Sequence, residues 1–311
     1  MKEIPYVNSV LEQPWWLDLV APDRWEEIII NDEKTGEVMA RFAYVSDGKK
    51  IYMPDKTQNL GIWMSEKVLK DYKSQKDIIN QIFMRLKHYR NIRHVLNPQN
   101  EYVLPFRWLG YHYETNFTYR IENLSDIEKV KSNFSKSTKR NINYAAKRVN
   151  VIADVKIDKA IETMYELLIK TYDLQKRKYP ISQKFTERYM QEAIENERGK
   201  YFEARDEDGN VHSCAFYLFD ANVCYYLTGA RDPAYSSSQS QELLLWEGIQ
   251  FAAKHSKVFD FEGSMVEGIE GFFRQFGAKC VPYYVITKQP LLSDIKDVVK
   301  PTIKKIIGYK I

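Results

Sequence analysis

The sequence predicts an α/β protein of two domains, each a central mixed β-sheet flanked by helices. At 311 residues, 44% of them hydrophobic, the chain is long enough for two ordinary domains with separate cores. Its 22 tyrosines, 15 phenylalanines and 6 tryptophans recur in short runs bounded by polar turns, which is typical of strands. Similar hairpin patterns occur in both halves of the chain, which suggests a duplicated domain.

The two hairpin patterns share an apolar strand, an acidic turn closed by glycine and a longer second strand. The first covers residues 27–45 and its turn ends at Gly36; the second covers residues 201–219 and its turn ends at Gly209. A valine stands two residues after the glycine in each. Two unrelated hairpins in a strand-rich protein are the alternative interpretation.

The second half of the chain shows the order helix, β-hairpin, strand, loop, helix, strand, helix, strand. Apolar residues at helical spacing predict an amphipathic helix over residues 158–176, before the second hairpin. After the hairpin we expect a strand at 223–229, a loop at 230–240, a nearly all-apolar helix at 241–254, a strand at 258–261, a short helix closed by Gly277 and a strand at 279–287. An antiparallel meander that runs into a βαβ crossover is unusual among α/β folds.

Composition argues against several classes of protein. The formal net charge of +4 is too small to indicate wholesale nucleic-acid binding. Cys214, Cys224 and Cys280 have no CxxC spacing, so neither a disulfide framework nor a zinc site is expected, and no metal is predicted. Cys214 and Cys224 lie in apolar strand-like runs and are expected to be buried thiols rather than nucleophiles. Because no apolar run reaches about 18 residues and no leader pattern opens the chain, a cytoplasmic protein without membrane insertion is expected.

Several short motifs carry a resemblance to a known family. They are QPWWL at 13–17, MP at 53–54 with TQNLG at 57–61 and Trp63, STKRNI at 137–142, FDFEGS at 259–264 and GFFRQFG at 271–277. Together with the order of elements they resemble the GNAT acyltransferase superfamily, in its FemABX-like branch, whose members carry two GNAT domains. The resemblance implies an N-terminal GNAT-like domain at 1–123, a catalytic one at 124–290 and an amphipathic basic tail at 291–311.

The length favours the shorter members of this branch. No stretch has heptads long enough for the helical arm of the interpeptide-bridge enzymes. The shorter relatives include sugar N-acyltransferases that use acyl-CoA and a nucleotide-linked amino sugar. The resemblance therefore implies acyl-CoA as co-substrate and an amino sugar as acceptor.

The pyrophosphate of such a carrier is commonly held at a helix N-terminus. The serine-rich loop before the apolar helix offers hydroxyls and amides and, over 235–241, no acidic side chain. In GNAT relatives the preceding strand parts from its neighbour and offers backbone groups to the pantetheine arm, and a glycine suits a bulge there. The predicted cofactor-binding residues are Leu227, Gly229, Ser236, Ser237, Ser238, Gln239 and Gln241. A flexible N-capping loop is the alternative.

Acyl transfer to an amine requires a neutral amine, a polarised carbonyl and a proton donor for the thiolate. Asp260 and Glu262 alternate with phenylalanines, which places both carboxylates on one face of a strand, as a general base or a clamp on the acceptor. A cap for the following helix is the alternative. Tyr226, predicted as catalytic, and Tyr217 are candidate donors to the thiolate, although tyrosines in strands also pack in cores.

Residues 129–148 contain seven Lys or Arg residues and no acid, and one apolar stripe. This pattern predicts an anionic partner, which could be a nucleotide diphosphate, a lipid pyrophosphate or tRNA; a solvated basic face is the alternative. The predicted substrate-binding residues are Thr57, Gln58, Asn59, Trp63, Lys136, Arg140, Tyr217 and Arg274. Residues 112–114 are also polar and aromatic enough to line a sugar or nucleobase pocket, whereas Trp15 and Trp16 are expected to anchor a core.

The sequence is compatible with three functions. The leading one is an acyl-CoA-dependent N-acyltransferase that acts on a nucleotide-linked amino sugar for bacterial surface polysaccharide. The second is aminoacyl-tRNA-dependent transfer to a peptidoglycan precursor, and the third is a non-catalytic module that binds an anionic glycan precursor or nucleic acid. The basic tail is expected to dock on the body of the protein, with a second subunit or a membrane surface as alternatives, so a homodimer stays open.

Overall fold

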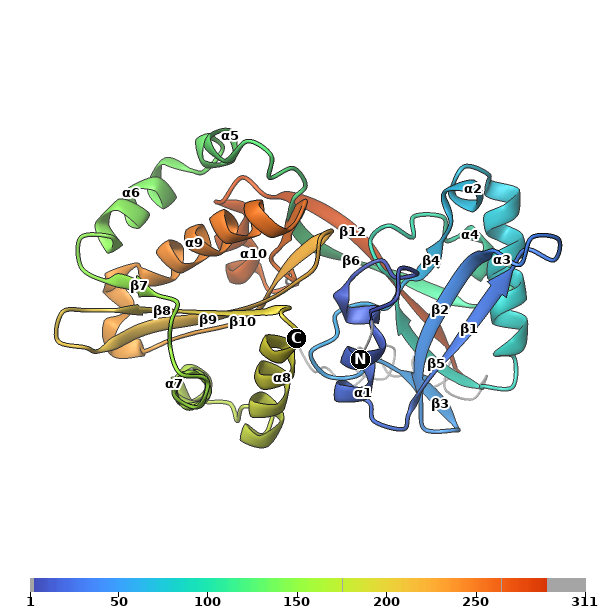
Figure 1. The fold of residues 1–311 in the computed structure, drawn as a ribbon, viewed down its shortest axis with the longest axis horizontal. Helices are drawn as coiled ribbons and strands as arrows, with labels where there is room; N and C mark the ends of the chain where they lie inside the picture. Colours follow the sequence, from blue (N-terminus) through green and yellow to red (C-terminus); the bar gives the residue numbers. More distant parts are fainter. Residues whose placement is uncertain (1–2, 175, 264, 290–311) are drawn as a thin grey trace, which may run out of the picture. The chain divides into compact units, whose positions relative to one another are not determined.

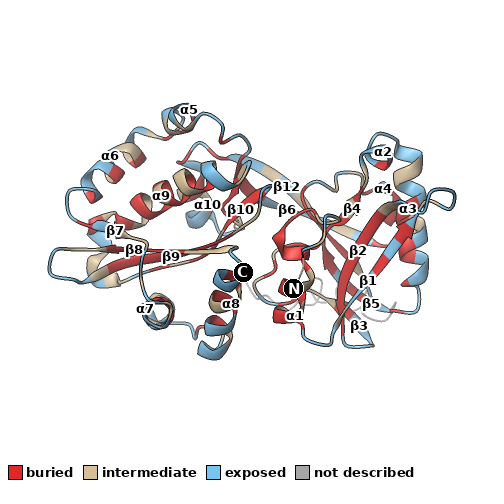
Figure 2. Ribbon diagram, viewed as in Figure 1, coloured by how far each residue is buried: buried red, intermediate tan, exposed pale blue. Residues whose placement is uncertain are grey.

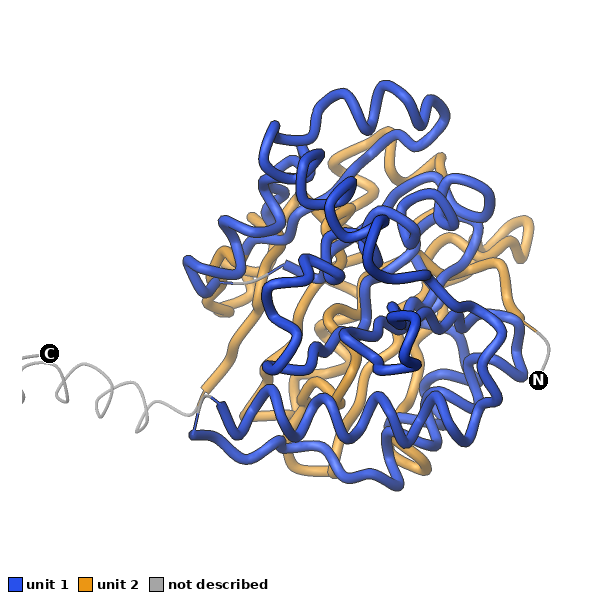
Figure 3. Tube along the Cα trace, turned by 90° about the vertical axis from the view of Figure 1, so that its left-hand side faces the viewer, with its two compact units in different colours: residues 1, 9–20, 117–282 blue, residues 2–8, 21–116, 283–311 orange. Residues whose placement is uncertain are grey.

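The computed structural model describes residues 3–174, 176–263 and 265–289, and the chain divides into two compact units (Figure 1, Figure 3). Unit 1 comprises residues 9–20 and 117–282; unit 2 comprises residues 21–116 with the segments before residue 9 and after residue 282. The predicted tail at 291–311 lies outside the described residues. No helix within the described ranges is both long and apolar enough to cross a membrane.

The predicted boundary between residues 123 and 124 needs a correction. The chain passes between the units inside two strands, β6 (His112–Ile121) and β12 (Lys279–Lys288). Helix α1 (Pro14–Val20) belongs to unit 1 because Trp15 and Trp16, both buried, pack in a core with residues of the helices and strands of that unit. These tryptophans are the core anchors that the sequence predicted.

Unit 2 is a mixed sheet in the order β1-β2-β3-β5-β12, with β4 paired to β2. Its strands and helices are β1 (Trp25–Asn31), β2 (Val38–Ser46), β3 (Lys50–Tyr52), β4 (Ile62–Met64), β5 (Asn91–Val95), α2 (Glu66–Leu69), α3 (Tyr72–Arg85) and α4 (Leu104–Trp108). Strands β3 and β5 are parallel, and the other pairings are antiparallel. The amphipathic α3 buries Ile79, Ile82 and Phe83 against this sheet.

Unit 1 has the sheet order β12-β6-β11-β10-β9-β8-β7. Its other elements are α5 (Ile127–Ser132), α6 (Lys136–Ala145), β7 (Asn150–Ile152), α7 (Ile157–Leu174), α8 (Gln183–Glu195), β8 (Gly199–Arg205), β9 (Val211–Phe219), β10 (Val223–Arg231), α9 (Ser240–His255), β11 (Val258–Asp260) and α10 (Glu267–Arg274). Helices α7 and α8 cover one face of the sheet and α9, with α5 and α6, the other (Figure 1). The sheet is therefore buried on both faces, as the red strands in Figure 2 show.

Most of the predicted elements are confirmed. Both hairpins form, and Gly36 and Gly209 have φ values of 75° and 86°, which explains why glycine closes each turn. The basic segment at 129–148 differs from the single helix that its apolar stripe suggested. It forms the two helices α5 and α6, because the Ser135 hydroxyl accepts a hydrogen bond from the backbone N–H of Thr138 at 3.1 Å and caps a new helix.

The cysteines lie as the sequence predicted. Cys214 and Cys224 are fully buried free thiols, and Cys280 is exposed. Burial raises the pKa of the Cys214 and Cys224 thiols well above the usual value. Both are therefore core residues rather than nucleophiles.

Candidate functional site

The site begins where two parallel strands separate. Strand β10 pairs with β11 only from Val223 to Tyr225, although β10 continues to Arg231. Strand β11 ends at Asp260, and the chain then turns through Glu262 and Gly263, which have φ values of 59° and 57°. Among the described residues, the second half of β10 thus has no ladder partner on the side of β11.

The turn is fixed by close packing against β6. A Cβ at Gly263 would lie 2.5 Å from the Phe117 carbonyl oxygen and 2.5 Å from the Thr118 Cα. Because a side chain would force the two segments apart, only glycine fits both this contact and the left-handed backbone. This packing is what directs the chain away from β10.

A pocket of about 490 Å³ opens along the unpaired part of β10. Strand β10 contributes Tyr226, Gly229, Ala230 and Arg231 to it, and one residue, Thr171, comes from α7. The first turn of α9 and the helix α10 supply the rest of its wall, including Gln239, Gln241, Glu242, Ile269 and Phe272. The structure therefore brings together four of the predicted residues, namely Tyr226, Gly229, Gln239 and Gln241.

Tyr226, Gly229 and Gln241 form one packed arrangement inside this pocket. The Gln241 side-chain amide donates a hydrogen bond to the Tyr226 phenol oxygen. A Cβ at position 229 would lie 1.7 Å from that oxygen, so the glycine is what lets the phenol lie across the strand. Burial raises the pKa of Tyr226 above its usual value, so the phenol keeps its proton at neutral pH and can donate a hydrogen bond.

A register shift against β9, between Tyr226 and Thr228, accompanies this arrangement. Leu227 stands at the shift, and its side chain is buried in the core with α7 and α8. The predicted contribution of Leu227 to a cofactor site is therefore restricted to its backbone. The bulge was expected at Gly229 and lies two residues earlier.

The N-terminus of α9, a helix of 16 residues, also lies at the pocket. Its N-cap residue Gln239 has a left-handed backbone with φ 58°. Asn141 of α6 donates hydrogen bonds to the side-chain oxygens of Gln239 at 3.1 Å and Glu242 at 3.0 Å. These two hydrogen bonds fix the start of α9. The N–H groups of its first turn point out of the helix.

The predicted serines contribute less than expected. Ser236 and Ser237 are exposed in a short 3₁₀ helix (Pro233–Ser238), Ser238 is buried, and none of the three lines the pocket. Glu242 adds an acid that the serine-rich loop itself lacks. The second and third residues of α9 line the pocket, whereas these three serines of the loop do not.

Asp260 is the clearest correction to the predicted site. Its carboxylate is fully buried and accepts hydrogen bonds from Arg120 Nε at 2.6 Å, Thr118 Oγ1 at 2.5 Å and the Glu262 backbone N–H at 2.8 Å. Desolvation has the largest single effect on the pKa of Arg120 and lowers it, but Asp260, Tyr225 and Glu122 together outweigh it and keep this pKa above its usual value. With its oxygens occupied, Asp260 is a structural anchor and not an accessible base.

Glu262 does not share a strand face with Asp260, because β11 ends at Asp260 and Glu262 lies in the turn. Its side chain is partly buried, and its charge raises the pKa of the buried Tyr189 phenol further, after the larger effect of burial. Glu262 is not among the residues that line the pocket beside β10.

The remaining predicted residues separate into several places. Tyr217 is fully buried and donates a hydrogen bond to the Leu244 carbonyl at 2.8 Å, so it is a core residue and not a substrate ligand. Lys136 and Arg140 are exposed on α6. Arg274 lines a second, more open hollow of about 650 Å³ with Ser135 and Gln275, and its guanidinium lies 3.1 Å from Glu270.

The four residues predicted near the N-terminus lie in unit 2 and do not line the pocket. Asn59 is buried and accepts a hydrogen bond from Asn97 Nδ2 at 2.8 Å, while Thr57 and Gln58 lie beside it in the chain. The Trp63 ring packs edge-on against Tyr6. These contacts hold a loop, which is a structural role.

Sequence reasoning missed several residues of the pocket wall. Thr171, Ile269 and Phe272 fit the apolar or helical periods of their segments, so the pattern assigned them to the core. Glu242 directly follows the predicted Gln241, and Arg231 lies two residues after the predicted Gly229, so both could have been found by extending the helix start and the strand end. Across the described ranges, no group of three His, Cys, Asp or Glu residues could hold a metal ion.

Comparisons with known proteins agree with this geometry. Residues 132–273 match the family described as Acetyltransferase (GNAT) domain. The structure of FemX is similar over 89% of this chain and 92% of that chain, at 12% identity and a TM-score of 0.67. The C-terminal domain of a putative lysylphosphatidylglycerol synthetase from Agrobacterium fabrum is similar over 92% and 94%, at 10% identity and a TM-score of 0.55. L-PGS from Bacillus licheniformis is similar over 91% and 90%, at 11% identity and a TM-score of 0.54.

No curated protein matches the sequence. At the identities of the solved structures the likeness is one of fold, which has a mixed sheet flanked by helices in both units. The family match covers most of unit 1, including the pocket and both helices at its rim. Residues 132–273 of unit 1 therefore match a GNAT acetyltransferase domain, which supports a transferase, and the chain as a whole shares its fold with FemX.

Proposed function

We propose that the chain transfers an acyl group from acyl-CoA to the amine of a nucleotide-linked amino sugar used for bacterial surface polysaccharide. The observation that carries the donor half is the pocket where β10 leaves β11 beside the start of α9. An unpaired strand edge offers backbone groups to the two amides of a pantetheine arm. The start of a 16-residue helix favours the negative charge of a pyrophosphate.

The chemistry assigns a role to Tyr226. When the amine attacks the thioester carbonyl, a C–N bond forms, the C–S bond breaks and the sulfur leaves as a thiolate. The Tyr226 phenol, whose pKa burial raises, stays protonated and can stabilise this thiolate by donating a hydrogen bond to the sulfur. The Gln241 amide donates to the phenol oxygen, which leaves the phenol O–H free to point into the pocket.

The attacking amine must also lose a proton, and we assign this step to Glu262. Its support is its place just past the end of β11, where the strands separate, and its partial exposure. Asp260 holds the Glu262 backbone N–H at 2.8 Å and thereby fixes the turn, so we assign Asp260 a positioning role.

The acceptor half rests on exposed cations. Arg274 is 69% exposed and lines the second hollow with the Ser135 hydroxyl, and Lys136 begins the helix that Ser135 caps. Guanidinium and hydroxyl groups suit a diphosphate. Arg140, one turn further along α6, extends the same basic face.

Aminoacyl-tRNA-dependent transfer is the second candidate, and the basic face of α6 is what favours it. Lys136 and Arg140 of α6 are exposed, as are Lys147 and Arg148 just after the end of the helix. Asn141 of the same helix contacts the rim of the pocket, so a polyanion on this face would bring its end close to the pocket. One of the structures with this fold is named as the C-terminal domain of a putative lysylphosphatidylglycerol synthetase.

Thermal unfolding with added ligands separates the two candidates, because a ligand that binds only the folded state stabilises it by about 2.7 kcal/mol at 100 times its Kd. CoA, acetyl-CoA, UDP, dTDP and bulk tRNA are titrated separately. We expect CoA and a nucleotide to raise the midpoint, and Gly229→Ala to abolish the CoA effect while the exposed-site control Glu207→Ala keeps it. A shift with tRNA alone, steeply reduced by salt, would contradict the acyl-CoA proposal and favour the second candidate.

A further inference from the structure

Unit 2 contains a hollow of about 620 Å³ that has no part in the chemistry above. Its wall is made by the end of α2, the first turn of α3, and the segment that leads into α4. The ring centroids of Tyr72 and Tyr102 lie 4.8 Å apart, and the planes of the rings make an angle of 56°. Leu69 and Leu104 line the same hollow. Tyr72 is 69% exposed, Leu69 48% and Leu104 46%, so this apolar surface is left in water by the fold.

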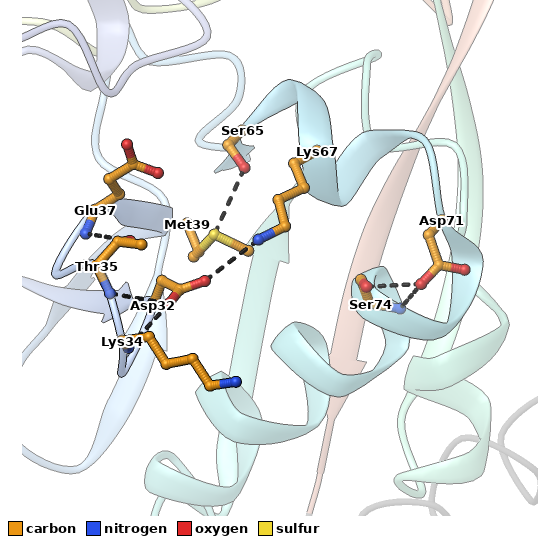
Figure 4. Close-up of polar contacts among 9 residues, drawn as sticks. All are labelled: Asp32, Lys34, Thr35, Glu37, Met39, Ser65, Lys67, Asp71 and Ser74. Atoms are coloured by element: carbon orange, nitrogen blue, oxygen red, sulfur yellow. Dashed lines mark hydrogen bonds and ion pairs between the residues drawn. The ribbon is translucent and has the colours of Figure 1, made fainter.

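Hydrogen bonds and an ion pair support the α2 and α3 side of the hollow, as Figure 4 shows. The Asp71 carboxylate accepts hydrogen bonds from the Ser74 hydroxyl at 2.6 Å and the Ser74 N–H at 2.9 Å, which fixes the turn that carries Tyr72. Lys67 of α2 pairs with Asp32 in the β1–β2 turn at 3.3 Å.

The opposite side is fixed as well. Asn100 donates to and accepts from the backbone of Ile62, both at 2.9 Å, and the Asn97 carboxamide accepts from the Gln99 N–H at 3.0 Å. A Cβ at Gly61 would lie 2.7 Å from the Asn100 side-chain oxygen, so the loop is packed directly on β4. Tyr102 therefore faces the hollow from a loop that is already ordered, as expected of a preformed binding site.

We propose that this hollow binds a sugar ring of a glycan. A sugar presents apolar C–H groups on its ring faces, which suit the exposed tyrosine rings, and hydroxyls at its edge, which suit the Gln99 amide and the Glu101 carboxylate. Glu101 is the one charged group among the lining residues. It disfavours phosphates and nucleotides and accepts hydrogen bonds from hydroxyls or from the ammonium of an amino sugar.

The lining also disfavours a peptide bound as an added strand. Strand addition needs an unpaired strand edge, and the hollow is lined by helix ends and a loop, with no residue of a strand among them, so this mode of peptide binding is disfavoured. The inference uses only residues of unit 2, so it does not rest on the transferase proposal.

Saturation-transfer NMR with the full chain tests this inference. The probes are glucose, galactose, mannose, N-acetylglucosamine, N-acetylgalactosamine and glucosamine, each alone. We expect transfer to the ring C–H protons of at least one sugar, and a Kd weakened roughly tenfold in Tyr72→Ala and in Tyr102→Ala, since loss of about 1.4 kcal/mol is tenfold. Met84→Ala, at a 54% exposed position on the same α3 helix but outside the hollow, and Gly229→Ala in unit 1 are expected to bind as the parent does.

Three results would overturn the inference: no transfer to any of the six sugars, transfer that Tyr72→Ala and Tyr102→Ala leave unchanged, or a dimer in sedimentation velocity that Tyr72→Ala dissociates. Tyr72 is mostly exposed, so its replacement is not expected to unfold the protein, and circular dichroism checks this. Loss of CoA binding in Gly229→Ala with sugar binding retained would separate this site from the donor pocket.

Discussion

Replacing Asp260 by alanine removes three hydrogen bonds at once from a fully buried carboxylate. It leaves the Arg120 guanidinium, only 7% exposed, without its counter-charge. Breaking a buried ion pair on one side costs about 3–5 kcal/mol. Because unfolding of a domain costs about 5–15 kcal/mol in total, this is a large fraction of the stability of unit 1. At roughly 2–4 °C per kcal/mol, the unfolding midpoint should fall by roughly 6–20 °C.

Differential scanning calorimetry and acyl transfer measured on the same samples test this reasoning. We expect Asp260→Ala to lower the midpoint and Glu207→Ala, at an exposed acid in a hairpin turn of the same unit, to change stability by no more than about 0.5 kcal/mol. If Asp260 were an accessible base, its replacement would abolish turnover with the midpoint unchanged. That combination would refute the assignment of Asp260 as an anchor.

Three further predictions concern glycine packing, a buried hydroxyl and pH. Gly229→Ala should weaken CoA binding at least about tenfold by displacing Tyr226. Gly248→Ala, whose Cβ would lie 2.3 Å from the Tyr217 ring, should instead cost about 1–3 kcal/mol of stability without a specific effect on CoA binding. Calorimetry and CoA titration of both variants test this, and reversed effects would contradict it. Tyr217→Phe should cost about 1 kcal/mol in urea unfolding and leave turnover intact; loss of turnover at unchanged stability would return Tyr217 to the site. Burial lowers the pKa of His94 to about 4 from the ordinary 6.5. Between these two pH values the folded state therefore binds fewer protons than the unfolded state. The free energy of unfolding is highest above this window and falls as the pH drops through it. The loss from about pH 7 to about pH 5 should be roughly 2 kcal/mol by urea unfolding and should largely disappear in His94→Gln; equal slopes in both proteins would exclude His94 as its source.

The secondary structure was largely predictable because its signals are local. Alternation, helical spacing and turn glycines depend on neighbouring residues, and α7, α9 and the hairpin of β8 and β9 follow them closely. The division into units was not predictable in this way. A tryptophan run at residues 15–16 indicates a buried segment, but nothing in it says which of two cores, one formed more than 100 residues later, will take it.

The residues of the candidate site also differ in whether their positions depend on local or on distant contacts. Gly229 and Gln241 were found because a glycine near a strand end and a polar helix start have local causes. The face of Asp260 was derived from strand alternation, which is correct for one residue and fails at Glu262, where the backbone becomes left-handed. That turn depends on the contact of Gly263 with β6, which lies about 140 residues earlier in the chain. The sequence pattern around Glu262 therefore cannot predict it.

The separation of β10 from β11 as the donor pocket is the central claim, and amide hydrogen exchange with and without CoA tests it most directly. We predict that CoA slows exchange in the second half of β10, from Tyr226 to Arg231, and in the first turn of α9, and that the sheet strands of unit 2 do not respond. Slowed exchange elsewhere with these amides unchanged, or no response to CoA at any site, would contradict it.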